Sequence, residues 1–149
     1  MPRYAATGNE NAVTSAFTTI LALIRGASRR AAIEWFALNA AGTIADQMIE
    51  YALMRFTAAP TVTGVTPASL DLANAASITT AGENASAEGT YTAATELFHQ
   101  EIHHRQTFQW YAPPDGQLVI PDTAAAGIGA RVLHATFTGP AKASMHFSE

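Results

Sequence analysis

The segment from Thr95 to Pro121 constrains the fold more than any other part of the chain. It begins with a long polar and aromatic run, passes through the turn-forming residues Pro113 to Gly116, and ends in a short apolar run. Proline fixes φ near the value that a turn needs, and glycine accepts a positive φ, so we expect this turn to reverse the chain. Two extended segments joined by a tight turn form an antiparallel pair. The sequence therefore predicts two paired strands on either side of residues 113–116.

Three of the five histidines lie in the same segment, at His99, His103 and His104. On a helix, His99 and His103 would share a face, as in some zinc motifs, but Glu101 would point away from it. On a strand, neighbours on one face stand about 7 Å apart, so a metal bound by His99, Glu101 and His103 would also need ligands from a second strand. We expect a polar sheet face or a subunit contact, with no metal and no other cofactor. A metal-dependent jelly-roll enzyme that uses these three residues is the alternative.

Several other segments have the composition and turn boundaries of strands. Residues 142–149 alternate most cleanly, with Ala143, Met145 and Phe147 on one side and polar residues on the other. We count about seven or eight strands, which predicts an all-β fold, an antiparallel β-sandwich that is jelly-roll-like. The other predicted strands are Ala12–Ile24, Ala31–Asn39, Ala75–Thr80 and Gly127–Thr138, and the predicted connections are Ala58–Asn74 and Ala81–Gly89.

The inward faces of two of these strands can also be predicted from alternation. In residues 31–39, Ile33 and Trp35 are expected on one face, with Phe36 and Leu38 on the other. In residues 127–138, the side chains expected to point inward are Leu133, Ala135 and Phe137. Apolar residues on both faces of the first segment indicate a strand buried between layers.

Two segments have weaker patterns. Residues 46–57 fit helical spacing slightly better than strand spacing, and Thr43 with Asp46 is similar to a capping box, but the neighbouring segments favour a strand. Residues 1–10 have no apolar period, so we predict an extended N-terminal arm before a single sandwich domain at residues 11–149. Such an arm would become ordered on assembly by adding a strand to a neighbouring sheet edge.

The composition excludes several classes of protein. There are no cysteines, so neither disulfides nor thiolate–metal sites are expected, and this composition suits a protein made in a reducing cytoplasm. A net charge of −4 provides no basic surface for nucleic acid. No apolar run reaches the roughly 20 residues that cross a bilayer, and we expect neither a signal peptide nor a membrane partner.

The low density of charge favours an assembled protein. Charged residues make up 13% of the chain, against about 25% in a typical soluble domain. A free monomer usually stays soluble by mixing charges over its surface. We therefore expect neighbouring subunits to cover much of this surface, although a neutral surface of Thr, Ser, Asn and Gln would also fit.

No pattern of catalytic residues is present, so we predict no enzyme and no catalytic site. The serines form no nucleophile elbow, and the glycines form no phosphate-binding loop. Trp35, Trp110 and Tyr111 have the chemistry of a sugar-binding face, although core or interface packing is more common for aromatic residues. A carbohydrate-binding β-sandwich is therefore a further alternative.

The overall layout resembles the small decoration, or cement, proteins on the capsids of tailed bacteriophages. The resemblance extends over nearly the whole chain and rests on fold landmarks. These landmarks are Arg3-Tyr4, Ala12-Val13-Thr14, Ile33-Glu34, the connection from Thr43 to Asp46, Met54-Arg55-Phe56, Phe98, Gln109-Trp110-Tyr111 with Pro113, and a last strand that ends in Glu149.

The resemblance implies a structural virion protein with no chemistry to perform. It implies a homotrimer that binds the outside of the shell where major capsid protein subunits meet. Such a trimer would hold the expanded head against internal DNA pressure. A tail or neck component of the same kind of particle is the structural alternative.

Overall fold

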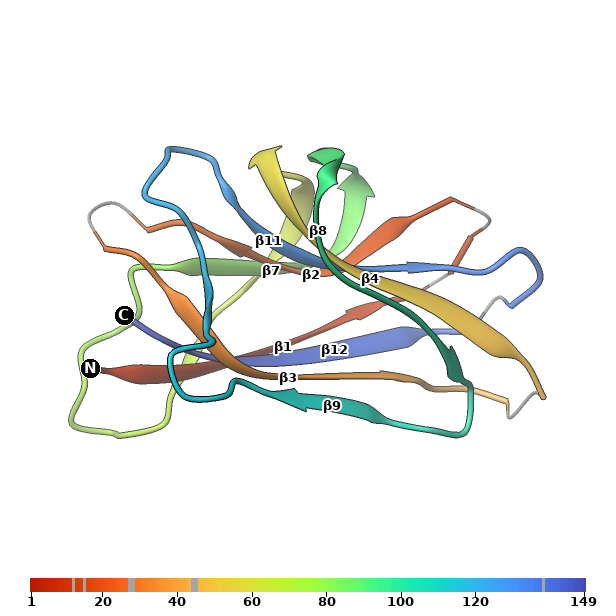
Figure 1. The fold of residues 1–149 in the computed structure, drawn as a ribbon, viewed down its shortest axis with the longest axis horizontal. Coiled ribbons are helices and arrows are strands. Elements are labelled where there is room, and N and C mark those ends of the chain that lie inside the picture. Colours follow the sequence, from red (N-terminus) through yellow and green to blue (C-terminus); the bar gives the residue numbers. More distant parts are fainter. Residues whose placement is uncertain (12, 15, 27–28, 44–45, 138) are drawn as a thin grey trace.

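The computed structural model describes residues 1–149 except 12, 15, 27–28, 44–45 and 138. Its described strands form two antiparallel sheets that face each other (Figure 1). Sheet A has the order β10-β3-β12-β1-β6, with β9 also paired to β3, and sheet B has the order β5-β7-β2-β11-β4-β8. The predicted all-β antiparallel sandwich is confirmed, while its jelly-roll-like character stays a prediction. The strands are β1 (Arg3–Glu10), β2 (Thr18–Ile24), β3 (Ala32–Ala40), β4 (Met48–Ala58), β5 (Thr61–Val65), β6 (Ala68–Ser69), β7 (Thr80–Ala87), β8 (Thr90–His103), β9 (Phe108–Tyr111), β10 (Leu118–Val119), β11 (Gly127–Leu133) and β12 (Ala141–Ser148).

The core lies between the two sheets, and both supply large apolar side chains to it. Phe36 and Phe147 come from sheet A, while Tyr51, Leu53 and Leu23 come from sheet B, and all five are almost completely buried. Full burial of one such side chain stabilises the fold by about 1.5–3 kcal/mol. The sandwich therefore draws most of its stability from this interior.

The predicted N-terminal arm is wrong, because residues 3–10 form an interior strand of sheet A. β1 pairs with β12 over its whole length and with β6 near its start. Its inward positions are Tyr4, Ala6, Gly8 and Glu10, of which only Tyr4 is a large apolar residue. The strand thus has a weak apolar pattern although every second residue is buried.

Residues 48–58 form strand β4, which settles the choice between helix and strand. β4 lies between β11 and β8 in sheet B, and Ile49, Tyr51 and Leu53 point into the core. Its other face is also covered, since Met54 and Phe56 are buried as well. With apolar residues on both faces, the period of two that marks a strand disappears.

The predicted connections at residues 58–74 and 81–89 contain three strands that the sequence did not reveal: β5, β6 and β7. The strand expected at residues 75–80 instead begins at Thr80 and continues to Ala87. Gly82 lowers the strand propensity of this segment, yet a side chain there would meet Val62 on β5, with a hypothetical Cβ 2.1 Å from Val62 Cγ2. Glycine is therefore needed where β5 and β7 approach closely.

The turn at residues 113–116 is present, but it does not join a hairpin. The Gly116 amide donates a hydrogen bond to the Pro113 carbonyl at 2.9 Å, and Asp115 has a positive φ of 61°. The strands on either side, β9 and β10, both pair with the same edge of β3 instead of with each other. The loop at residues 112–117 thus connects two strands that lie along the same edge of β3. The chain actually reverses between β8 and β9, where the Gln106 amide bonds the His103 carbonyl.

A β-bulge in β3 changes which side chains face the core. His146 of β12 pairs with Trp35 and Phe147 pairs with Ile33, so Glu34 is the extra residue. Ile33, Phe36 and Leu38 are buried, whereas Trp35 is only partly buried. The prediction that Ile33 and Trp35 share a face is therefore wrong.

The last two strands give one correct prediction and one error. In β12, Ala143, Met145 and Phe147 are buried as predicted. β11 ends at Leu133, and its core residues are Ile128, Ala130 and Val132. Ala135 is exposed in the following loop, while Phe137 is buried there. Ala12, Ser15 and Thr138, which belong to two predicted strands, lie outside the described residues.

Candidate functional site

His99 and His103 lie on β8, at one edge of sheet B, and contact different carboxylates, while His104 directly follows the strand. His99 Nε2 lies 2.6 Å from Glu50 Oε1, and its Nδ1 lies 3.1 Å from Glu96 Oε1. His103 Nε2 lies 3.0 Å from Asp46 Oδ1. Among the residues that the structure describes, no group of three or more His, Asp or Glu is placed to hold a metal ion. The structure thus gives His99 and His103 separate partners.

The remaining members of the run have different surroundings. Glu101 is exposed and lies opposite Glu50 in the pairing of β4 with β8. His104 is buried against Phe137, with ring centroids 4.7 Å apart. Burial acts to lower the pKa of His99, but its hydrogen bonds to Glu50 and Glu96 outweigh burial and raise that pKa. When it is protonated, His99 offsets the repulsion between the carboxylates of Glu50 and Glu96.

The three aromatic residues of the sugar-binding alternative separate onto two faces of sheet A. Trp110 turns inward and stacks on Phe36, with ring centroids 5.3 Å apart. Trp35 and Tyr111 lie opposite each other on β3 and β9, with ring centroids 6.2 Å apart, on the outer face. His146 of β12 lies opposite Trp35 on its other side, at 4.4 Å. We call His146, Trp35 and Tyr111 the aromatic row, because they cross three adjacent strands.

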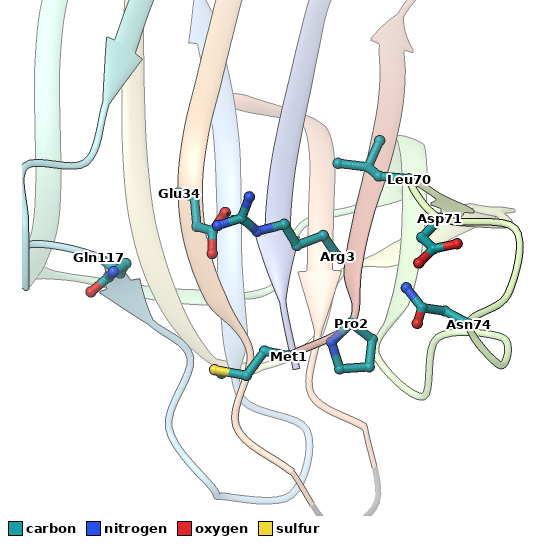
Figure 2. Close-up of a pocket in the computed structure, with 8 residues that line it drawn as sticks. All are labelled: Met1, Pro2, Arg3, Glu34, Leu70, Asp71, Asn74 and Gln117. Atoms are coloured by element: carbon teal, nitrogen blue, oxygen red, sulfur yellow. Dashed lines mark ion pairs between the residues drawn. The ribbon is translucent and has the colours of Figure 1, made fainter.

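Two adjoining pockets open on this outer face, and we call them together the outer groove. One has a volume of about 370 Å³ and lies against the aromatic row. The other, of about 870 Å³, continues toward the N-terminus, and both share Arg3, Glu34 and Leu70. Figure 2 shows Arg3 and Glu34 pointing toward each other between Gln117 on one side and Asp71 with Asn74 on the other. The groove thus joins an aromatic floor to a polar wall.

Local backbone structure places the polar wall. The bulge in β3 turns both Glu34 and Trp35 toward the groove. Arg3 Nε lies 3.1 Å from Glu34 Oε2, and the Arg3 carbonyl accepts a hydrogen bond from the Leu70 amide at 2.9 Å. Burial lowers the pKa of His146, with the Glu34 charge acting in the opposite direction, so His146 is neutral near pH 7. The Arg3–Glu34 ion pair then provides the main charged groups beside the aromatic row.

Sequence reasoning missed Arg3, Glu34 and Leu70 as members of a site. Arg3 was placed in an arm, and Leu70 in a long loop, so neither was expected beside Trp35. The alternation of residues 142–149 did place His146 on the outward face, which was the one available signal. Two flanking strands paired to β3 bring His146 and Tyr111 to Trp35, and such pairing is a long-range property.

A second surface projects from sheet B. The end of β4, the strand β5, the end of β7 and the start of β8 rise away from the body of the sandwich (Figure 1). We call residues 57–65 and 84–95 the tip. Glu88 is its single charged residue, and most of the rest are Thr, Ala, Ser or Gly. The exposed side of the tip is therefore small and uncharged.

Glu88 is directed into the protein and anchors the tip on the outer face of sheet B. Its Oε2 accepts a hydrogen bond from Thr19 Oγ1 at 2.6 Å and lies 3.3 Å from Arg131 Nη2. The Arg131 guanidinium also lies 4.0 Å from the ring centre of Tyr91, whose hydroxyl is 2.8 Å from Thr19 Oγ1. Burial raises the pKa of Tyr91, so it remains a neutral phenol. This cluster fixes the connection between β7 and β8.

β8 also presents an open edge. It pairs with β4 on one side and ends the order of sheet B on the other. It is 14 residues long, and residues 90–95 at its start carry no charge. Natural edge strands are usually short or protected by charge, because a free edge pairs readily with another chain. The start of β8 is neither short nor charged, and its pairing with β4 is interrupted by register shifts.

No helix among the described residues is long and apolar enough to cross a membrane.

Comparison with known proteins identifies no relative of this chain. No family model, curated protein sequence or solved structure matches the chain.

Proposed function

We propose that this chain is a structural virion protein, a capsid decoration protein that binds the outside of the major capsid protein shell and stabilises the expanded head. The observation that carries the proposal is the uncharged tip beside the open edge of β8. The resemblance to decoration proteins of tailed bacteriophages supports it independently. The partners are the major capsid protein and two further copies of the chain.

The chemistry of the tip suits close packing against another protein. Small side chains such as Ala93, Ala94 and Thr92 let two backbones approach closely, and burying them leaves no charge without a partner. An open strand edge adds main-chain hydrogen bonds by β-augmentation. Each contact of this kind is weak, but contacts repeated over a shell add through avidity.

The placement of the tip also fits a protein bound on one side. The tip rises from sheet B, whereas β3, β9 and β12 form the opposite layer of the sandwich (Figure 1). A chain bound to the shell through its tip would leave the outer face of sheet A directed away from the shell. Decoration and exposure of the outer groove are therefore compatible.

The proposal is tested by binding of the purified chain to expanded, undecorated heads of the virus that encodes it, measured by co-sedimentation. Ala93→Glu places a charge on the exposed tip, and we expect it to abolish binding. Ala135→Glu makes the same change in an exposed loop after β11, at the end of sheet B away from the tip, and should bind like the parent chain. Equal binding of both variants, or no binding of the parent chain to heads, would contradict the proposal.

The oligomeric state is a separate part of the proposal. Light scattering of the purified chain near neutral pH should give three times the chain mass of 15.7 kDa. A stable monomer at all concentrations would remove the homotrimer from the proposal while leaving the head-binding experiment to decide the rest.

A further inference from the structure

The aromatic row offers a stacking surface of the kind that ring-shaped ligands use. Tyr111 is 68% exposed, which is unusual for a large aromatic side chain, and Trp35 lies beside it in a direct cross-strand pair. The planes of the two rings are tilted by 50°, so they form a shallow trough instead of a flat plate. Aromatic ring faces carry negative electrostatic potential and attract the weakly positive C–H groups of a ligand.

The Trp35 indole presents its ring to the groove and not its polar edge. Its Nε1 atom is buried and makes no hydrogen bond among the described residues. Trp35 therefore contributes apolar contact, and hydrogen bonding to a ligand must come from the polar wall, the Tyr111 hydroxyl or the His146 ring.

The polar wall supplies donors and acceptors within the same groove. The side-chain amides of Asn74 and Gln117 line the larger pocket and make no hydrogen bond with described residues. Arg3 and Glu34 stand between them, with 64% of the Arg3 side chain exposed (Figure 2). Amide, carboxylate and guanidinium groups each pair with hydroxyl groups, which both donate and accept.

The charge of the groove favours a neutral ligand. Arg3 and Glu34 neutralise each other as an ion pair, and His146 is neutral near pH 7 because burial lowers its pKa. Asp71 is the remaining charged side chain of the lining and would repel an anion. A ligand with apolar ring faces, several hydroxyl groups and no charge matches the aromatic row, the polar wall and the charge of the groove.

We infer that the outer groove binds a neutral saccharide, with a pyranose ring stacked on Trp35 and Tyr111 and its hydroxyl groups bonded along the polar wall. The volume of the pocket over the row, about 370 Å³, falls within the range of small-ligand sites, roughly 300–1,000 Å³. A proline-rich peptide would also use an aromatic trough, but its prolines have no N–H to donate to Glu34 or to the amide oxygens of Asn74 and Gln117. The site goes beyond capsid decoration and does not depend on it.

The test is calorimetric titration of the full chain with neutral oligosaccharides: maltohexaose, cellohexaose, xylohexaose, mannohexaose and chitohexaose, each at millimolar concentration. We expect at least one to bind, and we expect Tyr111→Ala to weaken that binding tenfold or more. Lys142→Ala changes an exposed residue on the same strand as His146 and should leave the affinity unchanged. Glu34→Gln, which breaks the ion pair, should weaken binding severalfold.

Tryptophan fluorescence locates the ligand, since the chain has two tryptophans in different surroundings. A bound saccharide should protect Trp35 from a soluble quencher, and the protection should persist in the variant Trp110→Phe. Binding of none of the five oligosaccharides would overturn the inference, as would binding that Tyr111→Ala leaves intact. Binding of a proline decamer at this groove without saccharide binding would also overturn it, in favour of a peptide site.

Discussion

Glu149 holds the loop before β7 through its side-chain carboxylate. The carboxylate accepts hydrogen bonds from Ser77 Oγ and the Thr79 amide, both at 2.6 Å, and from the Ile78 amide at 3.1 Å. Burial acts to raise the pKa of Glu149, but these hydrogen bonds outweigh it and lower that pKa below its usual value near 4.5. A carboxyl group with a lowered pKa in the folded state stabilises the fold at pH values above its unfolded pKa.

We expect Glu149→Gln to lower the free energy of unfolding by about 1–2 kcal/mol near pH 7, because a neutral amide is a weaker acceptor than a carboxylate. The contribution is lost as the pH falls through the folded pKa, so the difference between parent and variant should shrink below about pH 4.5. Urea unfolding of the parent chain and the variant at several pH values measures this difference in the free energy of unfolding. The exposed Asp115→Asn serves as the control and should change stability by less than about 0.5 kcal/mol at neutral pH. A difference independent of pH would mean that shape, not charge, holds the loop.

Gly129 and Gly64 are both strand glycines, but their surroundings differ. A Cβ at Gly129 would lie 2.3 Å from the Tyr91 hydroxyl, whereas a Cβ at Gly64 would meet nothing within 4 Å. Tyr91 cannot easily move, because Arg131 and Thr19 hold its ring and its hydroxyl. The close approach of Tyr91 to β11 thus requires glycine at position 129.

Gly129→Ala should therefore destabilise the protein by about 1–3 kcal/mol, since overpacking forces neighbouring groups to shift. Gly64→Ala should be neutral or slightly stabilising, because it reduces the freedom of the unfolded chain. Thermal unfolding of both variants tests the pair. The double variant Gly129→Ala with Tyr91→Ala should recover part of the loss, and simple additivity of the two changes would argue against this steric account.

At the scale of elements, the neighbouring aromatic residues Trp110 and Tyr111 of strand β9 have opposite roles. Trp110 is partly buried and stacks on Phe36 of the core, while its neighbour Tyr111 lies on the outer face and is 68% exposed. Trp110→Ala should lower the free energy of unfolding by about 3–5 kcal/mol, because it opens a cavity. Tyr111→Ala should cost less than about 1 kcal/mol, so the two variants separate stability from binding. Equal losses in urea unfolding would contradict the opposite placement of the two side chains.

The fold class was predictable from the sequence because strand composition and turn residues are local signals. β12 shows this most clearly, since one of its faces is in the core and the other is not, which gives strict alternation. β4 lacked that signal because both of its faces are buried, and β1 lacked it because Ala6, Gly8 and Glu10 occupy inward positions. Small or polar residues at buried positions remove the pattern on which strand prediction depends.

The candidate sites were only partly predictable, for a different reason. Trp35 and Tyr111 were chosen for their chemistry, but the sequence could not show that β9 pairs with β3 in the register that makes them neighbours. The bulge at Glu34 shifts Trp35 to the outer face, and no local pattern marks it. The turn at residues 113–116 was recognised correctly, yet turn chemistry does not decide which strands pair beyond it.

At the scale of the whole molecule, the sandwich separates two kinds of surface. The outer groove on sheet A combines exposed aromatic and polar groups, whereas the tip on sheet B is almost without charge. Glu88, the single charged residue of the tip, is bonded to Thr19 and Arg131. Association through the tip and the nearby edge of β8 would therefore involve little electrostatic attraction.

This property leads to a prediction about salt. Contacts made by ion pairs weaken as the screening length falls from about 10 Å at 0.1 M salt to about 3 Å at 1 M. A homotrimer joined through uncharged surfaces should keep its mass by light scattering over this whole range of NaCl. Sulfate should favour the trimer further, because its exclusion from protein surfaces strengthens burial. Dissociation in 1 M NaCl would instead mean that ion pairs hold the subunits together, for example between acidic residues such as Glu50, Glu96 and Glu101 of the β4–β8 face and basic residues of another copy.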